Sequence, residues 1–520
     1  MADIRLLDVS IRDGNQSLWG ATGLTTRQIL QIAPVLDRAG FAALDFTSST
    51  HMGIAVRNHR ENPWQRIRLA HAALPHTPLQ FIGTGFRFIS WETSNPEVMR
   101  LVYERLVDCG IGKFIVLDPM HDMAAVRRTA ATIRAVGGQE VMGALTYTVS
   151  DVHDDAFYAG LAGQMAACPD ITRAYLKDPA GLLTPDRART LIPAIAGQLA
   201  GKPLELHSHC TLGLSPLTYL IAAELGVSVL HTGCGPLANG TSLPDAQRVT
   251  ANLREQGHRV SVNDAAVAAA AAYFRRLGAA ESRPAGTPGE YDASFLRHQL
   301  AGGVVTTLRR QLAEIGLAGR FGAVMAEVAR VRAELGYPIM VTPFPQVVCS
   351  QALANVIGSE RYAQVPDQVI RYVLGRFGRP AGPVDPDVAD RILSLPRARE
   401  LAAEPPPPGL AELRARFPGA GDEEMLLRAV MPAAEVDAML AAEAAGPPDR
   451  HYNPDLQGVL SLLRELGSRP GGPGVTDLTV RKPRFRLTLR GAPGHRGPGG
   501  APRPAERSPG LAERGAAGAG

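Results

Sequence analysis

The sequence predicts a closed (β/α)8 barrel, followed by a mostly helical C-terminal segment and a disordered tail. Eight short apolar or β-branched runs precede residue 240, and stretches of roughly 20–30 residues with helical periodicity separate them. Strands that alternate with helices at this period predict a parallel sheet, and eight such units predict a closed barrel. Polar residues and glycines gather where several runs end, which is where a barrel places its reactive groups. An open, doubly wound sheet is the alternative.

The eight predicted strands are short and consist mainly of apolar and β-branched residues. They are Ile4–Asp8, Ala43–Phe46, Leu79–Gly83, Lys113–Asp118, Glu140–Tyr147, Arg173–Lys177, Pro203–His207 and Ser228–His231. Thr26–Ala39 and Pro216–Leu225 are examples of the amphipathic helices expected between them. The barrel domain is expected to occupy residues 1–275.

The chain changes character after the barrel. Residues 276–445 are predicted to form a helical C-terminal domain, because Leu296–Leu317, Ala323–Gly336 and Pro366–Phe377 have the pattern of amphipathic helices. Pro405–Pro408 is a stiff break within this domain.

Two further segments complete the predicted organisation. Residues 446–490 form a small segment with a helix at Leu456–Leu466 and strands at Val475–Val480 and Arg484–Leu489. Residues 491–520 consist mainly of Gly, Pro, Ala and Arg, which bury almost nothing, so a disordered tail is expected there.

The composition excludes several classes of protein. The 520 residues are 45% hydrophobic, which allows more than one core. No apolar run approaches the roughly 20 residues that cross a bilayer, and no secretory signal precedes the first strand, so membrane insertion is not expected. The five scattered cysteines favour a reduced, cytoplasmic location over a disulfide framework. A net charge of +4 is too small on this length to indicate a nucleic-acid partner.

Two histidines separated by one residue close the seventh predicted strand. Side chains alternate along a strand, so His207 and His209 share a face and can offer two imidazole nitrogens to one divalent metal. The pattern alone also fits two ordinary polar residues. Three other strand ends carry similar polar segments, Arg12–Ser17, Lys177–Thr184 and His231–Ser242. Four such ends predict one shared site at the barrel mouth.

These segments resemble a known family, the biotin-dependent carboxyltransferases. Arg12–Ser17, Lys177–Leu183, His207–His209 and Pro236–Ser242 resemble the carboxyltransferase domain of pyruvate carboxylase. They resemble still more closely the oxaloacetate decarboxylase α subunit and the transcarboxylase subunit that carries the metal. Beyond the barrel, the family's helical portion is matched by His298–Leu308, Val341–Pro343 and Gln351–Val356. The resemblance covers about residues 4–435 in the right order.

The resemblance implies a divalent metal held by Asp13, Lys177, His207 and His209, with Lys177 carrying a carbamate. An ammonium group cannot ligate a cation. A lysine beside a metal is therefore driven toward the neutral amine, which can add carbon dioxide and become an anionic oxygen ligand. Zinc suits the two imidazoles, whereas manganese or cobalt suits the oxygen ligands. The alternative for Lys177 is a salt bridge to Asp178.

The implied activity is carboxyl transfer between biotin and a small 2-oxo acid of the pyruvate or oxaloacetate type. Such an acid reacts through an enolate, whose charge a metal stabilises as a Lewis acid. By resemblance, Arg12 and Gln16 hold the substrate and the enolate oxygen, and Thr306 relays a proton between biotin and substrate. Without the resemblance, Thr306 is an ordinary helix-surface threonine. Gln346 replaces the biotin-contacting lysine of pyruvate carboxylases, as in the decarboxylase branch.

Biotin is expected to arrive on a separate polypeptide, because the sequence contains no Ala-Met-Lys-Met or equivalent attachment motif. The implied partners are a biotin carboxyl carrier protein and a biotin carboxylase subunit, and the chain is expected to form a homo-oligomer. Residues 459–490 resemble the N-terminal segment of bacterial biotin carboxyl carrier proteins.

Departures from the family pattern leave the acceptor open. Thr84 stands where pyruvate carboxylases place a substrate-binding arginine, with Arg87 as a replacement, and Cys210 and His231 stand where they carry acidic residues. One alternative is the aldolase-type group of hydroxymethylglutaryl-CoA lyase and isopropylmalate synthase, which shares the barrel, the Arg-Asp-Gly-x-Gln loop and the His-x-His. That group lacks the lysine ligand and the match beyond the barrel. The other is a non-catalytic scaffold that docks carboxylase subunits, although a scaffold does not need four ligand positions.

Overall fold

Eight parallel strands close a barrel within the first of two structural units, residues 1–454. The computed structural model describes residues 2–90, 93–300, 302–446, 477–482 and 485–490. The side chains of residues 302–303, 306–307, 477–482 and 485–490 are outside this description. The strands are β1 (Asp3–Asp8), β2 (Leu44–Ser48), β3 (Leu79–Gly83), β4 (Ile111–Val116), β5 (Glu140–Thr146), β6 (Arg173–Asp178), β7 (Leu204–Ser208) and β8 (Val229–Thr232).

Closure comes from the first strand, which pairs with β8 along its length and with β2 at Asp8 and Leu44. The predicted closed barrel is therefore confirmed, and the open sheet is excluded. A short strand, β9 (Arg259–Val260), pairs with the beginning of β1. The strands are buried almost throughout, as expected for a parallel sheet covered by helices, and this explains their near-continuous apolar runs.

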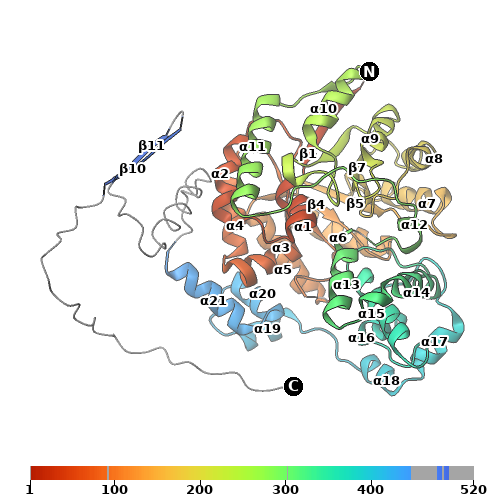
Figure 1. The fold of residues 1–520 in the computed structure, drawn as a ribbon. Helices are drawn as coiled ribbons and strands as arrows, with labels where there is room; N and C mark the ends of the chain where they lie inside the picture. Colours follow the sequence, from red (N-terminus) through yellow and green to blue (C-terminus); the bar gives the residue numbers. More distant parts are fainter. Residues whose placement is uncertain (1, 91–92, 301, 447–476, 483–484, 491–520) are drawn as a thin grey trace, which may run out of the picture. The chain divides into compact units, whose positions relative to one another are not determined.

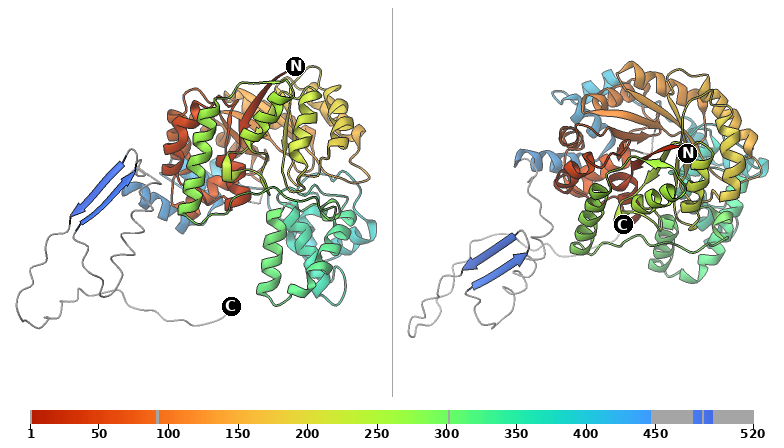
Figure 2. Two further views of the ribbon diagram at one scale, coloured as in Figure 1. Left: turned by 45° about the horizontal axis from the view of Figure 1, so that its top comes forward. Right: turned by 90° about the horizontal axis from the view of Figure 1, so that it is seen from above.

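Helices surround the barrel, as the view from above in Figure 2 shows. The main ones are α2 (Thr26–Asp37), α4 (Pro63–Ala73), α5 (Pro96–Asp108), α6 (Met123–Ala135), α7 (Asp155–Ala166), α8 (Pro185–Ala196), α9 (Ser215–Glu224), α10 (Ala246–Glu255) and α11 (Asp264–Ala280). Shorter turns follow β1, β2 and β8, namely η1 (Ser10–Gly14), α1 (Asn15–Trp19), α3 (Ser49–Ile54), η2 (Ala55–His59) and η3 (Gly235–Leu237).

The short helix α12 (Phe295–His298) packs against the barrel core. Six further helices lie on one side of the barrel (Figure 1) and carry a core of their own. They are α13 (Gly302–Glu314), α14 (Phe321–Glu334), α15 (Phe344–Ile357), α16 (Asp367–Val373), α17 (Pro386–Leu393) and α18 (Pro396–Ala402). Met120, from the segment after β4, is buried in this second core and so joins it to the barrel.

The prediction of one helix over Leu296–Leu317 is wrong, because the chain breaks between α12 and α13. Gln299 adopts a left-handed conformation with φ of 54°, which ends α12. Its side chain bonds the loop after β5, accepting from the Thr148 hydroxyl at 2.7 Å and donating to the Val149 carbonyl at 2.6 Å. Arg332 of α14 donates to the same Thr148 hydroxyl at 2.9 Å. These buried contacts fasten the helical segment to the barrel.

The last three helices of the first unit return to the barrel. They are α19 (Leu410–Arg416), α20 (Asp422–Val430) and α21 (Ala433–Ala444), and their apolar side chains are buried in the barrel core. Glu423 of α20 pairs with Arg68 of α4 at 2.6 Å, and Glu435 of α21 pairs with Arg57 at 3.1 Å. Helical residues on the two sides of Pro405–Pro408 thus belong to different cores, and the domain boundaries at 275 and 445 stay predictions.

The second unit, residues 455–520, contributes one described element, an antiparallel hairpin of β10 (Asp477–Lys482) and β11 (Phe485–Arg490). The two predicted strands there are confirmed, whereas the predicted helix Leu456–Leu466 and the tail 491–520 lie outside the described residues. No described helix combines the length and apolar character needed to cross a bilayer. All five cysteines are buried and unbridged.

Candidate active site

Four side chains predicted to be ligands converge at the carboxyl ends of the strands. His207 Nε2 lies 3.1 Å from His209 Nε2, 3.1 Å from Lys177 Nζ and 3.2 Å from Asp13 Oδ2. One ligand-type atom from each of Asp13, His207 and His209 lies within 4.8 Å of the others. The sequence prediction that these residues share one site is in agreement with this geometry.

Strand register and a tight turn bring these groups together. Lys177 pairs with His207 across β6 and β7, and His207 and His209 share a face because side chains alternate. Asp13 comes from η1, which packs against η3. A Cβ atom on Gly14 would lie 2.5 Å from the Leu237 carbonyl oxygen, so this close approach requires glycine.

Lys177 contacts Asp13 at 3.4 Å, so its predicted alternative, a salt bridge to Asp178, is wrong. Asp178 is the last residue of β6 and accepts hydrogen bonds from the Leu182 and Leu183 amides and the Ser208 hydroxyl.

Arg12 links this cluster to an acidic residue that the sequence analysis did not single out. Its guanidinium pairs with Asp13 at 2.8 Å and donates from Nε to Asp45 at 2.8 Å, with all three side chains buried. Asp45 lies inside the buried strand β2, and a lone acid within a predicted barrel strand was the signal that could have found it. Burial alone would raise the pKa of Asp13, but the adjacent charge of Arg12 holds it well below its usual range.

Burial shifts the protonation of two of the three basic ligand-type groups, Lys177 and His207. It lowers the pKa of Lys177, which moves this group toward the neutral amine. Burial, together with the charge of Lys177, lowers the pKa of His207 well below its usual range, which favours the neutral imidazole. A neutral imidazole is the form that ligates metals.

The two histidines are held by different partners at their other ring nitrogens. His209 Nδ1 lies 2.7 Å from the Thr241 carbonyl oxygen. His207 Nδ1 lies 3.3 Å from His231 Nδ1, and His231 Nε2 lies 3.0 Å from Glu205 Oε2. Glu205 was also missed, although it is the one acid in the buried strand β7.

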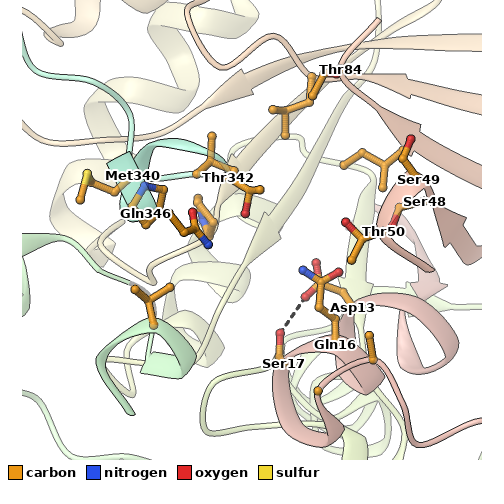
Figure 3. A pocket seen from close by; sticks show the side chains of 18 of the residues that line it. Asp13, Gln16, Ser17, Ser48, Ser49, Thr50, Thr84, Met340, Thr342 and Gln346 are labelled. Atoms are coloured by element: carbon orange, nitrogen blue, oxygen red, sulfur yellow. Dashed lines mark hydrogen bonds between the residues drawn. The ribbon is translucent and has the colours of Figure 1, made fainter. Parts of the chain in front are cut away.

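A pocket of about 800 Å³ opens above this cluster, between the barrel mouth and the helical segment. Figure 3 shows Met340, Thr342 and Gln346 on one wall, facing Asp13 and Gln16 on the other. The pocket lining includes the predicted site residues Arg12, Asp13, Gln16, Lys177, His209 and Gln346. The two walls therefore bring together residues that lie more than 300 positions apart in the sequence.

Thr306 belongs to α13, but its side chain lies outside the described groups. Val304 and Leu308, two residues to either side, line the pocket. The helix that carries Thr306 therefore reaches the site, and the role of Thr306 stays a prediction.

Arg87 and Thr84, which depart from the family pattern, both line the pocket. Arg87 Nε donates to the Thr84 hydroxyl at 3.3 Å. Burial lowers the pKa of Arg87 to about 10, so it stays charged near neutral pH in a poorly hydrated position. Such a guanidinium is well suited to an anionic ligand.

Known proteins resemble this chain over most of its length. The family model described as conserved carboxylase domain matches residues 295–451. The chain is 31% identical over 393 residues to a pyruvate carboxylase subunit of Methanocaldococcus jannaschii, covering 75% of this chain and 68% of that protein. It is 27% identical over 509 residues to the 2-oxoglutarate carboxylase large subunit of Hydrogenobacter thermophilus, covering 95% and 77%.

A solved structure shares the fold. The carboxyl transferase domain of Rhizobium etli pyruvate carboxylase with oxamate and biotin aligns with a TM-score of 0.76 at 23% identity, covering 86% of this chain and 78% of that one. A closed parallel barrel with reactive groups at the carboxyl ends of its strands is the arrangement of a barrel enzyme. The chain belongs to the biotin-dependent carboxyltransferase family, together with the pyruvate carboxylase subunits that it matches. The resemblance seen in the sequence is thereby confirmed.

Proposed function

We propose that the protein transfers a carboxyl group between biotin on a carrier protein and a small 2-oxo acid. The convergence of Asp13, Lys177, His207 and His209 at the base of one pocket carries this proposal. Relatives named as subunits of pyruvate carboxylase and of 2-oxoglutarate carboxylase support the choice of 2-oxo acids. Their names as subunits also support biotin carboxylase and carrier subunits as partners.

The donor groups fit a divalent metal. Two imidazoles and a carboxylate are ligands that zinc, manganese and cobalt accept, and their nitrogen and oxygen atoms lie close enough to share one ion. Lys177 would be the fourth ligand in its carbamate form, and its lowered pKa supports reaction of the amine with carbon dioxide. The metal would supply Lewis-acid stabilisation of the charge that develops on the keto oxygen.

The chain's own groups would bind and orient the reactants. Arg12 is rigid, because two carboxylates hold its guanidinium, and it would present donors to the substrate oxygens without reorganisation. Gln16 would bind the substrate from the barrel wall of the pocket, and Gln346 would contact biotin from the opposite wall. Thr306 would relay the proton between biotin and the substrate carbon.

A carboxyl-transfer assay tests the proposed reaction. Carboxybiotin, on a carrier protein or free, is offered with pyruvate, 2-oxoglutarate and acyl-CoA esters, and uncarboxylated biotin is offered with oxaloacetate as the carboxyl donor. We expect biotin-dependent transfer to or from at least one 2-oxo acid. Cleavage of an acyl-CoA or a hydroxy acid without biotin would instead support the lyase alternative. No turnover of any pair by protein of verified metal content would support the scaffold.

We predict that His207→Ala and His209→Ala each lose the bound metal and transfer activity. Each change removes one nitrogen from the donor group, and the remaining ligands hold a divalent ion less well. Metal analysis of purified wild-type and variant protein measures the effect, with His76→Ala as a control at an exposed histidine. Equal metal contents in wild type and both site variants would refute the metal assignment.

We predict that Arg87→Ala lowers kcat/KM for the 2-oxo acid roughly 10- to 100-fold, mainly through KM. A hydrogen bond to a charged group contributes about 1.5–3 kcal/mol, which corresponds to this range. Metal content should not change, because Arg87 lies on the pocket wall and not among the ligand-type groups. Arg297→Ala, at an exposed arginine, is the control. An unaltered KM in Arg87→Ala would exclude Arg87 as the substrate-binding arginine.

A further inference from the structure

We propose that Glu205 and His231 are positioning residues that fix the tautomer of His207, so that its Nε2 atom directs a lone pair into the cation site that it shares with Asp13, Lys177 and His209. This inference rests on the proposed function, because it concerns the same donor cluster. It assigns a role to two residues that the site needs although neither lines the pocket.

The three residues form a chain of contacts inside the barrel. Glu205 Oε2 lies 3.0 Å from His231 Nε2, and His231 Nδ1 lies 3.3 Å from His207 Nδ1. Their side chains are almost inaccessible, with relative exposures of 2% for Glu205 and 0% for both histidines. Water cannot replace a missing hydrogen-bond partner at these buried side chains. The ring protons of the two histidines must therefore be satisfied by the three side chains themselves.

The Glu205 carboxylate orients the protons along these contacts. An ionised carboxylate only accepts, so a neutral His231 must carry its proton on Nε2 and leave Nδ1 bare. His207 then donates from Nδ1, and its Nε2 is bare. In the opposite arrangement, the bare Nε2 of His231 would face a carboxylate oxygen at 3.0 Å, and two acceptors at that distance repel each other. A second carboxylate oxygen, Asp13 Oδ2, lies 3.2 Å from His207 Nε2 at the other end of these contacts, but Arg12 already pairs with that oxygen, and the Lys177 amine, 3.1 Å from Nε2, can donate to the bare nitrogen.

His209 also has an unprotonated Nε2, but a backbone group and not a side chain fixes its tautomer. Its Nδ1 lies 2.7 Å from a backbone carbonyl oxygen, which only accepts, so its Nε2 is also bare. The two bare Nε2 atoms then lie 3.1 Å apart. A cation between them removes this repulsion, so the arrangement of protons favours the proposed metal. The backbone fixes His209, whereas two side chains fix His207.

The tautomer can be measured without metal or activity. In metal-free protein labelled with ¹⁵N-histidine, the signals of His207 are identified by their loss in His207→Ala. We expect a protonated Nδ1 and an unprotonated Nε2 in the wild type, and loss of this preference in His231→Phe. A protonated Nε2 on His207 in the wild type would overturn the inference.

Metal affinity gives a second readout. Zn²⁺ dissociation constants are measured by competition with a chelator for wild type, His231→Phe, His231→Asn and Tyr175→Phe, together with the melting temperature of each metal-free protein. We expect His231→Phe to bind Zn²⁺ 10- to 100-fold more weakly. His231→Asn should recover part of the loss, because its side-chain oxygen can accept from His207 Nδ1.

Tyr175→Phe is the matched control. The Tyr175 ring centroid lies 5.5 Å from that of His207 and 5.1 Å from that of His231, and its hydroxyl has no protein partner among the described residues. We expect wild-type Zn²⁺ affinity for it. A lower melting temperature with wild-type affinity in His231→Phe would overturn the inference, because His231 would then only fill space. If the wild type has the expected tautomer but binds no Zn²⁺, the metal proposal fails while the positioning role stands.

Discussion

Lys177→Ala is expected to lose both the bound metal and carboxyl transfer, and Lys177→Arg is expected to restore neither. The Lys177 amine lies 3.1 Å from His207 Nε2 and 3.4 Å from Asp13 Oδ2, where a metal ligand is required. Burial moves the amine toward its neutral form, the form that can add carbon dioxide. A guanidinium stays protonated in proteins and cannot form a carbamate, so arginine keeps the charge without the ligand.

Metal content and the rate of transfer from carboxybiotin measure this effect, both at a fixed bicarbonate concentration. Lys202→Arg is the matched control, because the Lys202 amine donates to backbone carbonyl oxygens, including that of Ile171 at 2.7 Å. Active Lys177→Arg protein with a full complement of metal would show that Lys177 acts only as a partner for Asp13.

Thr306→Ala is expected to reduce transfer from carboxybiotin about 10²–10⁴-fold, the usual contribution of a positioned proton relay. An unperturbed threonine is a poor acid, so Thr306 must pass a proton on and not release it. Its backbone belongs to α13, which begins at Gly302 and brings Val304 and Leu308 to the pocket. Metal content and folding should not change, and Thr306→Ser should retain more activity because the hydroxyl is kept.

Thr307→Ala is the control that the sequence itself provides. The two threonines are adjacent on one helix, where successive side chains project about 100° apart. We expect only Thr306→Ala to lose transfer. If only Thr307→Ala lost transfer activity, the proton relay would be Thr307 and not Thr306. Biotin-independent turnover at the wild-type rate in Thr306→Ala would support an aldolase-type lyase, which needs no such relay.

Much of the barrel could be predicted because its strands obey a simple rule. A parallel strand covered on both faces must be apolar throughout, so its ends can be located in the sequence to within about two residues. The break at Gln299 could not be predicted in the same way. The apolar periodicity continues across it, and the left-handed turn is stabilised by bonds to Thr148 and Val149, about 150 positions earlier.

The candidate site also contains residues that could be predicted from the sequence and residues that could not. His207 and His209 could be predicted from spacing because one strand places them together. Asp45 and Glu205 act through partners that lie on or just after other strands, and no local pattern records which strands will be neighbours in the barrel. The resemblance to a family supplied Thr306 and Gln346, because only the folded chain brings α13 and α15 to the barrel mouth.

Because α19–α21 pack against the barrel, the segment of residues 302–402 is attached to the barrel at both of its ends. Gln299 attaches the N-terminal end of this segment to the loop after β5, and the apolar side chains of α20 and α21 attach its C-terminal end to the barrel core. A segment attached at both ends has little conformational freedom in the folded protein. The conformational entropy of placing residues 302–402 over the barrel mouth is therefore lost once, when the chain folds, and not at each encounter with a carrier protein. An isolated barrel must likewise include residues 410–444, since cutting the chain at Pro405–Pro408 would strip part of its apolar cover.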